Sequence, residues 1–438
     1  MDKLQEIAKA TGLEIIPNDP LAPLSTDQRT WAKLQKTSPK FNDEGEVVKH
    51  PAPKKLRTNY AVILENDPEY KTLCYHEHSD RILLQKKEVN DAKLEDIAIH
   101  FERSYRLSIT IQNLLSAVVR VAHKNPYTPI KDWLEGLDPW DPKEDTPIID
   151  DLATTILNCE NVEGYEELIR EMSAKMWIGF VARIMEPGCK LETMPILIGP
   201  KGTGKSTIME IMAGSDWFCR SDLKIGTKDA LELIHQSGVW IWEMGELRSL
   251  QGKTADIAKQ FFSDCEDRYR GSYQRMPTTR KRRVCFFGTT NNLQILDDGP
   301  ERRFWIFKNL GPVDLKKLRK QKLNIWREAL YRYKQGIEHN KTASFEDKKA
   351  IWWLDWEMEK ENSSYQTCFI VDDPWGGKIQ KALKDNFNMA MSTSDLMEKL
   401  EIPIAHRHVG NSRRISQIMR DLEYKITVSD GKRVWKKI

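Results

Sequence analysis

A glycine-rich segment near the middle of the chain has the composition of a phosphate-binding loop. It reads GPKGTGKS, follows the apolar run PILI and precedes the helical stretch STIMEIMAG. Glycines let backbone amides turn toward a β-phosphate at a helix N-terminus, while Lys205 neutralises the β- and γ-phosphates and Ser206 offers a hydroxyl to Mg²⁺. The pattern predicts an ATP site made of Gly199, Pro200, Lys201, Gly202, Thr203, Gly204, Lys205, Ser206 and Thr207.

Two acids follow a second apolar run, VWIW. Glu243 comes directly after this run, and Glu246 stands three residues further on. A Mg²⁺-dependent nucleoside triphosphatase needs a carboxylate at the end of a neighbouring strand, so we assign Glu243 to the metal side together with Ser206. The sequence leaves open which of the two acids polarises the attacking water, and a solvated loop position is the alternative for each.

A third apolar run, CFFG, ends in the polar residues TTNN. An amide at this position can hold the attacking water against the γ-phosphate, which makes Asn291 a candidate. Eleven residues later, Arg302 and Arg303 precede the apolar run FWIF, where a guanidinium could reach a neighbouring subunit's γ-phosphate as an arginine finger. The alternative is that both arginines pair with Asp297 and Asp298.

Basic charge is concentrated in two segments of a chain whose net charge is only +3. Residues 268–283 hold seven Arg or Lys and no acid, and residues 406–438 carry a net +6, which leaves −10 for the rest. Such clustering indicates a polyanionic partner.

The first basic segment, residues 268–283, also contains tyrosines. Guanidinium groups neutralise phosphates while tyrosine rings stack on unpaired bases, so the tract predicts a site for single-stranded DNA or RNA. A merely solvated face is the alternative. Because the tract joins two adjacent core strands, we expect a hairpin that emerges near the nucleotide and points into a central channel. The predicted contacts are Arg268, Arg270, Tyr273, Arg275 and Lys281.

Composition and hydrophobic spacing divide the 438 residues into four parts. Residues 1–58 are rich in Pro, Lys and Asp, which predicts an extended or poorly ordered segment. Residues 59–143 contain helical patterns and a predicted strand pair at CYHEHSDRILLQ, and form a predicted helical domain. Residues 144–340 alternate short apolar runs with helical patterns, which predicts an α/β domain with a parallel sheet, and residues 341–438 form a C-terminal domain.

The C-terminal domain is predicted to begin with a tryptophan-rich helix, KKAIWWLDWEMEKE, and a turn at PWGG. Two short helices and two strands around Asp430 and Gly431 then follow in the helix-helix-hairpin order of a winged helix. Arg413 and Arg414 lie on the second short helix, where we expect them to contact duplex DNA. The alternative is a small domain that packs on the ATPase domain or binds a protein.

Several classes of protein are excluded by the composition. No stretch approaches the roughly 18 uninterrupted apolar residues of a membrane span. The first twenty residues lack the apolar region of a secretory signal. Seven cysteines without a CxxC pair indicate neither a disulfide framework nor a zinc module. We therefore expect a cytoplasmic protein with no membrane partner.

Five segments occur in an order and spacing that resemble the virulence-associated protein E family: WIGFVARIMEPGCKLETMPILIGPKGTGKST, WEMGEL, KQFFSDCEDRYRGSYQR, RRVCFFGTTNN and ERRFW. The likeness covers about residues 165–310 and, more weakly, the segments NYAVILENDPEY and NPYTPIKDWLEGL. That family looks like a branch of the superfamily 3 helicase type of AAA+ ATPases of phages and mobile genomic islands. The resemblance implies an α/β P-loop core of this type, around which the patterns above predict a mostly helical N-terminal domain and a winged-helix-like C-terminal domain.

The resemblance also implies residue roles and an assembly. It implies phosphate and Mg²⁺ contacts at Gly204, Lys205 and Ser206, the second motif's acid at Glu243, the sensor at Asn291, a segment leading to a pore hairpin with Lys259, Arg270 and Tyr273, and trans-acting arginines at Arg302 and Arg303. Such ATPases form hexameric rings that thread DNA, so a homo-hexamer is implied. Relatives tend to have Gly-Asn where this chain has Pro300-Glu301. No primase carboxylate pattern is evident, so a primase would be a separate partner.

Together these features favour an ATP-dependent DNA helicase or replication initiator of a phage or mobile genetic element. Single-stranded DNA is the expected partner, and duplex origin DNA is a second one. An ATP-controlled nucleic-acid-binding protein with a regulatory or defence role and no unwinding activity also fits, because it shares the phosphate loop. A small-molecule kinase would leave the basic tract and Arg302 and Arg303 unexplained.

Overall fold

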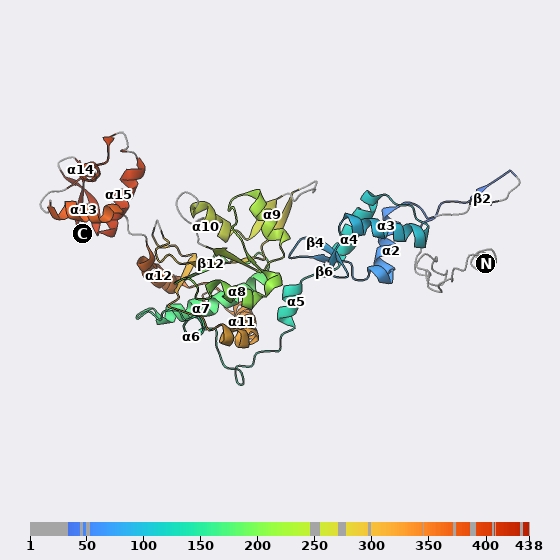
Figure 1. The fold of residues 1–438 in the computed structure, drawn as a ribbon, viewed down its shortest axis with the longest axis horizontal. Coiled ribbons are helices and arrows are strands. Elements are labelled where there is room, and N and C mark those ends of the chain that lie inside the picture. The colour runs from blue at the N-terminus through green and yellow to red at the C-terminus, as the bar shows by residue number, and fades with distance from the viewer. Residues whose placement is uncertain are drawn as a thin grey trace.

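The structure is a computed structural model that describes residues 34–437 with short gaps (Figure 1). The gaps are residues 44–46, 50–52, 246–254, 270–276, 297–298, 345, 371–373, 386–390, 405–406, 408 and 430–431. Within the described residues there are three separate hydrophobic cores, one before residue 123, one between residues 130 and 369, and one after residue 378.

The largest core surrounds a sheet of five strands that are all parallel. They are β7 (Met194–Ile198), β8 (Phe218–Arg220), β9 (Ile241–Gly245), β12 (Cys285–Thr290) and β13 (Phe304–Lys308), in the order β13-β7-β12-β9-β8. Every residue of β7 and β12 is buried, because each has a strand on both sides and helices over the sheet. Burial on both faces explains their continuous apolar runs and confirms the predicted parallel α/β arrangement.

Helices cover both faces of this sheet (Figure 1). Three indole rings join them to it: Trp326 packs against Trp177 and Trp240, with ring centroids 5.4 and 4.3 Å away. The helices and short turns are α5 (Pro129–Glu135), α6 (Leu152–Thr155), α7 (Glu166–Met185), α8 (Lys205–Ala213), η3 (Ser215–Trp217), α9 (Lys228–Gln236), α10 (Ala255–Ser263) and α11 (Leu315–Thr342).

The parallel sheet has two chemically different edges. Because all strands run the same way, their carboxyl ends meet at one edge, which carries the glycine-rich loop after β7 and Asn291 after β12. The opposite, amino edge carries the residues that precede the strands, including Arg283 before β12 and Arg303 before β13. A strand of five residues spans about 17 Å, so the two edges are far apart.

The basic tract folds back on itself at the amino edge. Strands β10 (Glu266–Tyr269) and β11 (Thr278–Lys281) pair antiparallel, and β12 begins four residues after β11 ends. The expectation that this segment emerges near the nucleotide loop is therefore wrong. A connection between parallel strands must return the chain to the edge where the next strand starts, and the hairpin occupies the end of that return.

The N-terminal core lies between three helices and a small sheet. The helices are α2 (Arg57–Asn66), α3 (Asp91–Tyr105) and α4 (Ile111–Lys124), and the short turn η2 (Pro68–Tyr70) follows α2. The strands β3 (Cys74–His76), β4 (Arg81–Leu84), β5 (Lys87–Glu88) and β6 (Pro126–Tyr127) form a sheet in the order β5-β4-β3-β6, and β1 (Lys40–Phe41) pairs with β2 (Val47–Lys49). The antiparallel strands β3 and β4 confirm the strand pair predicted at CYHEHSDRILLQ, and β5 and β6 extend it to a sheet that was not predicted.

The C-terminal core is built from helices and a hairpin. Its elements are α13 (Pro374–Asp385), α14 (Thr393–Lys399), α15 (Val409–Asp421), β14 (Tyr424–Ser429) and β15 (Lys432–Lys437), and α12 (Trp356–Tyr365) and η6 (Gln366–Phe369) precede them. A capping box between Ser392 and Asp395 starts α14.

Two local expectations for this region are wrong. The helix expected over KKAIWWLDWEMEKE begins only at Trp356, since Asp355 caps it and the indole of Trp352 instead donates to the carbonyl of Lys190 at 2.8 Å. The run PWGG is not a turn but the start of α13. Pro374 suits a first helical turn, because its φ is already helical and its missing N–H has no partner there.

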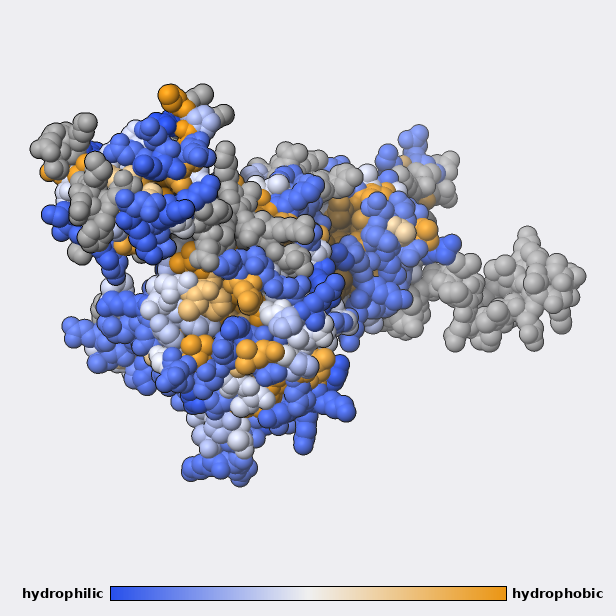
Figure 2. All heavy atoms as spheres, turned by 60° about the vertical axis from the view of Figure 1, so that its left-hand side comes forward, coloured by the Kyte–Doolittle hydropathy of each residue, from blue (hydrophilic) through white to orange (hydrophobic). Residues whose placement is uncertain are grey.

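The visible surface is mainly polar. In Figure 2 hydrophilic residues predominate on the face shown, and apolar residues occur in small separate groups. Among the described residues, no helix combines the length and apolar character needed to cross a membrane.

Candidate functional site

A pocket of about 510 Å³ lies at the carboxyl edge of the parallel sheet. It brings together the glycine-rich loop after β7, the acid of β9 and the polar residues that end β12, which the sequence separates by up to 90 residues. The residues that line it are Lys201, Gly202, Thr203, Gly204, Lys205, Ser206, Thr207, Arg220, Glu243, Gly245, Thr289, Thr290 and Asn291.

Two glycines of the loop have conformations that other residues would not tolerate. At Gly199 a Cβ atom would lie 2.3 Å from the carbonyl oxygen of Asn309, so the loop passes directly against the end of β13. Gly204 has φ +89° and forms the N-cap of α8. The loop therefore ends at the N-terminus of α8 beside the pocket, a position suited to an anion.

Lys205 is the buried cation of the pocket, with 6% of its surface exposed. Its Nζ donates to the carbonyl oxygens of Gly199 and Pro200 at 2.7 and 2.6 Å, and to Oδ1 of Asn291 at 3.0 Å. These contacts satisfy the ammonium donors and hold the lysine directly between the loop and the end of β12. The structure thus brings Lys205 and Asn291 together.

Glu243 lies inside β9 rather than after it, because the strand runs on to Gly245. Its carboxylate is 1% exposed. The hydroxyl of Thr289 donates to Oε1 at 2.7 Å, and Nε of Arg220 donates to Oε2 at 2.7 Å. Arg220 also donates to the carbonyl of Ser206 at 2.8 Å, so one guanidinium ties the acid to the start of α8.

Arg220 is a site residue that sequence reasoning missed. It stands on β8, 23 residues before Glu243, and no motif marks it. The signal that could have found it is positional: Arg220 ends the short strand β8, and in a parallel sheet this end reaches the same edge as the glycine-rich loop. Glu246, the other acid, lies outside the described residues.

Arg302 and Arg303 lie at the amino edge, away from the pocket of their own chain. Arg302 pairs with Glu192 at 2.7 Å and Glu359 at 3.7 Å. Arg303 pairs with Glu301 at 2.9 Å and donates to the hydroxyl of Ser263 at 2.7 Å. The predicted alternative partners, Asp297 and Asp298, lie outside the described residues.

Glu301, which follows Pro300 and precedes the two arginines, is held by several contacts. Besides Arg303, it pairs with Lys259 of α10 at 3.3 Å. The buried amide of Gln366 holds the backbone of Glu301 on both sides, accepting from its N–H at 2.6 Å and donating to its carbonyl at 3.0 Å. Lys259 is therefore part of this ion-pair cluster.

The cations of the basic tract that the structure describes fall into two groups. Arg268 of β10 and Lys281 of β11 are exposed. Arg282 is 1% exposed, pairs with Asp267 at 2.6 Å and stacks on Phe261. Arg280 and Arg283 pair with acids of the N-terminal part of the chain. The predicted contacts Arg270, Tyr273 and Arg275 lie outside the described residues.

The second basic segment places its arginines on α15. The guanidinium of Arg414 lies 4.0 Å from the ring centroid of Trp375 on α13. This cation–π contact joins two helices of the C-terminal core. Arg413 is the preceding residue of α15.

The fold and the pocket define the class: a mixed α/β protein with a parallel sheet whose carboxyl edge carries a glycine-rich loop, a buried lysine and a buried acid. A family model, described as the virulence-associated protein E-like domain, matches residues 134–367. The chain belongs to this family.

Solved structures of the C-terminal region of NrS-1 are also similar. An apo structure in the A form has 12% sequence identity and a TM-score of 0.44, covering 86% of this chain and 97% of that chain. Another apo structure has 14% identity and a TM-score of 0.43, with the same coverages of 86% and 97%. No curated protein matches the sequence.

Proposed function

We propose that this protein is an ATP-dependent DNA helicase or replication initiator of a phage or mobile genetic element, with an AAA+ core of the superfamily 3 helicase type. One observation carries the proposal: Lys205, Glu243 and Asn291 converge on one pocket at the carboxyl edge of a parallel sheet. In open α/β sheets, ligands bind in the crevice outside the carboxyl ends of the strands.

ATP would bind with its phosphates against the loop Gly199–Thr207. The amides at the start of α8 and the ammonium of Lys205 supply positive charge where the phosphates need it. Mg²⁺ takes oxygen ligands, and the hydroxyl of Ser206 and the carboxylate of Glu243 are such donors at one pocket. When bound, Mg²⁺ would neutralise charge on the phosphate oxygens, and Asn291 would orient the attacking water.

Arg302 and Arg303 support a ring in which neighbouring chains complete each site. Both precede β13 and so lie at the edge opposite to their own pocket. If either arginine contacts a nucleotide, that nucleotide would be bound in the pocket of an adjacent copy, as expected for an arginine finger in a homo-hexamer. A primase would come from another chain.

Single-stranded DNA is the proposed substrate of the hairpin β10–β11. Arg268 and Lys281 offer exposed charge on its two strands, and Arg270, Tyr273 and Arg275 follow in the segment between them. Charge would bind the phosphates and the tyrosine would stack on bases.

Duplex origin DNA is the proposed partner of the C-terminal unit. Its order α14, α15, β14, β15 is that of a winged helix, with Arg413 and Arg414 on α15 as the recognition helix. Deleting the chain from residue 386 onward should weaken duplex binding more than single-strand binding, measured at one salt concentration. Equal duplex affinity with and without the segment would reject this assignment.

The test of the whole proposal is hydrolysis with and without single-stranded DNA, together with the mass of the assembly. We expect ATP hydrolysis that DNA stimulates, a hexameric mass in the presence of ATP, and displacement of an annealed strand. Hydrolysis and DNA binding without strand displacement would instead identify an ATP-controlled regulatory or defence protein. A chain that hydrolyses no ATP under any of these conditions would refute both readings.

A further inference from the structure

The turn between β3 and β4, residues 77–80, contacts the base of the hairpin β10–β11. The residues on either side of them belong to different hydrophobic cores: Tyr75 and Leu84 flank the turn and lie in one core, and Phe262 and Val284 flank the hairpin and lie in the other. Glu77 and Arg283 are 206 residues apart in the sequence. Two ion pairs and two further hydrogen bonds join the turn to the base of the hairpin, and Gly238, which precedes β9, packs against the turn.

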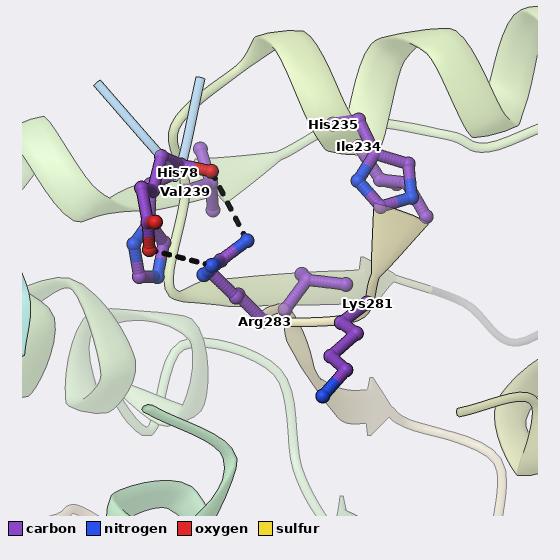
Figure 3. A pocket seen from close by; sticks show the side chains of 8 residues that line it. His78, Ile234, His235, Val239, Lys281 and Arg283 are labelled. Carbon is purple, nitrogen blue, oxygen red and sulfur yellow. Dashed lines mark hydrogen bonds and ion pairs between the residues drawn. The ribbon is translucent and has the colours of Figure 1, made fainter. Parts of the chain in front are cut away.

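Glu77 holds the end of the tract. Nη2 of Arg283 donates to Oε2 of Glu77 at 2.7 Å, and Nη1 donates to the main-chain carbonyl of Glu77 at 3.2 Å (dashed lines in Figure 3). The Arg283 side chain is 19% exposed. The guanidinium of Arg283 thus binds both the side chain and the backbone of Glu77, which fixes the orientation of the guanidinium as well as its position.

Asp80 holds both strands of the hairpin. Its Oδ1 pairs with Nη2 of Arg280 on β11 at 2.8 Å, and its Oδ2 accepts from the hydroxyl of Tyr269 on β10 at 3.5 Å. The guanidinium of Arg280 also lies 5.7 Å from the ring centroid of Tyr75 on β3. Asp80 is 10% exposed, so water screens these interactions weakly.

The turn is packed too closely for a loose surface contact. Gly238 has φ +72°, and a Cβ atom there would come within 3.1 Å of the Cβ of Ser79. His78 is 5% exposed and, together with Arg283 and His235, lines a cavity of about 10 Å³ (Figure 3). A space of that size holds at most about one water molecule.

These contacts change the charge that the tract presents. Arg280 and Arg283 are neutralised by the turn, and Arg282 is neutralised within its own unit by Asp267. The arginines near the base are therefore structural, while Arg268 and Lys281 remain exposed. A count of basic residues alone does not separate these two roles.

We propose that Glu77 and Asp80 are positioning residues for the basic hairpin. They would hold its base against the N-terminal unit, so that its exposed cations meet single-stranded DNA from a fixed direction. This inference rests on the DNA role proposed above. Strand β12 would connect the base of the hairpin to the pocket, because Arg283 lies two residues before β12 and Asn291 follows the other end of that strand.

The test compares Glu77→Gln/Asp80→Asn in the full-length chain with the control Glu88→Gln. Glu88 belongs to the same small sheet and pairs with Arg81 at 3.1 Å, so its ion pair lies within the N-terminal unit and does not involve the hairpin. Three quantities are measured: amide hydrogen exchange in β10 and β11, affinity for single-stranded DNA, and stimulation of ATP hydrolysis by that DNA.

In the double variant we expect exchange in β10 and β11 to accelerate about tenfold, because two charge-assisted contacts are lost. DNA affinity should be equal to that of the parent or higher, since two guanidinium groups become available to phosphates. DNA stimulation should fall about fivefold, within the range of couplings between sites. A merely structural role would lower affinity and stimulation together.

Results like those of Glu88→Gln in all three measurements would overturn the inference, and so would a parallel loss of affinity and stimulation. Failure of the function proposal has a different signature. If the parent chain shows no DNA-stimulated hydrolysis, the DNA role fails, while hydrogen exchange in β10 and β11 still decides whether the turn holds the hairpin.

Discussion

Lys205 is the residue on which the proposed chemistry depends most. We expect Lys205→Ala to lower the rate of ATP hydrolysis by more than about 100-fold, because the charge that develops on the γ-phosphate loses about 3 kcal/mol of stabilisation. Lys316→Ala, which removes an exposed ammonium near the start of α11, serves as the control in the same assay. Normal turnover by folded Lys205→Ala protein would contradict the nucleotide site.

Arg220 and Glu243 form an ion pair at the pocket. Removing Arg220 should therefore make the stability of the protein depend on whether Mg²⁺ is bound near Glu243. Arg220→Met leaves a buried carboxylate for which the described residues offer the Thr289 hydroxyl as the remaining donor. Because Arg220 is about half exposed, we expect a loss of about 1–2 kcal/mol, seen as a lower melting temperature in EDTA.

Mg²⁺ should recover most of this loss if Glu243 is a metal ligand. The conservative variant Arg220→Lys, which keeps the charge, should melt near the parent in both conditions. An Arg220→Met deficit that is the same in EDTA and in Mg²⁺ would argue against Glu243 as a ligand.

His78 makes the contact between the two units sensitive to acid. Burial is the main cause that lowers the pKa of His78 to about 3, and the nearby Arg283 and His76 lower it further. The unfolded chain takes up a proton near pH 6.5, whereas the folded chain takes it up only near pH 3. Stability from this group is therefore full above about pH 6.5 and decreases as the pH falls.

We expect His78→Phe to lose this part of the pH dependence, which amounts to at most about 1.4 kcal/mol per pH unit between pH 6.5 and 5. The measurement is thermal melting of the parent and the variant across that range. His339→Gln, which removes an exposed imidazole from α11, is the control. Parallel pH curves for the parent and His78→Phe would show that His78 is not responsible.

At the scale of elements, the hairpin β10–β11 separates exposed from structural arginines. Arg268→Ala should weaken binding of single-stranded DNA and flatten the dependence of log affinity on log salt by about 0.7, the value for one phosphate contact on a single strand. Arg282→Ala should instead destabilise the fold by about 3 kcal/mol, because it leaves Asp267 buried without its main partner. Salt titrations and melting curves of both variants distinguish the two roles, and an unchanged salt slope in Arg268→Ala would remove Arg268 from the DNA site.

An element can be predicted from the sequence when the residues that determine it are contiguous in the chain. The parallel sheet, α7 and the glycine-rich loop follow from contiguous patterns, and all three were predictable. The start of α13 was missed because a proline followed by glycines indicates a turn as readily as a first helical turn. The hairpin's place at the amino edge was predictable in principle, since β12 follows it almost directly.

Contacts between distant segments were beyond prediction from one sequence. Arg220 reaches Glu243 only because β8 and β9 are neighbours, and the order β13-β7-β12-β9-β8 is not written in any single segment. The acids that neutralise Arg280 and Arg283 lie some 200 residues earlier in the chain. A tract without acids in the sequence is therefore partly neutral in the folded protein.

At the scale of the whole molecule, the separation of the two edges predicts complementation between subunits. Lys205→Ala chains lack a working pocket but keep Arg302 and Arg303, whereas Arg303→Ala chains have the reverse defect. If Arg303 acts on a neighbouring pocket, mixing the two inactive proteins should restore hydrolysis at some interfaces, to roughly a quarter of the parent rate for equal random mixing.

The same mixing experiment is repeated with Arg302→Ala, and native mass measurements establish that each variant assembles. No recovery with Arg303→Ala, in mixtures that do assemble, would exclude a trans role for that residue. Recovery with only one of the two arginines would identify the finger.

The turn at residues 77–80 has a consequence for inheritance. Its carboxylates and their arginines are encoded at opposite ends of a stretch of more than 600 nucleotides, yet they form one contact. A recombination crossover anywhere between them would join one parent's turn to another parent's hairpin. Descendants should therefore retain both ion pairs or replace them together, and gene chimeras that match the two segments should outperform those that do not.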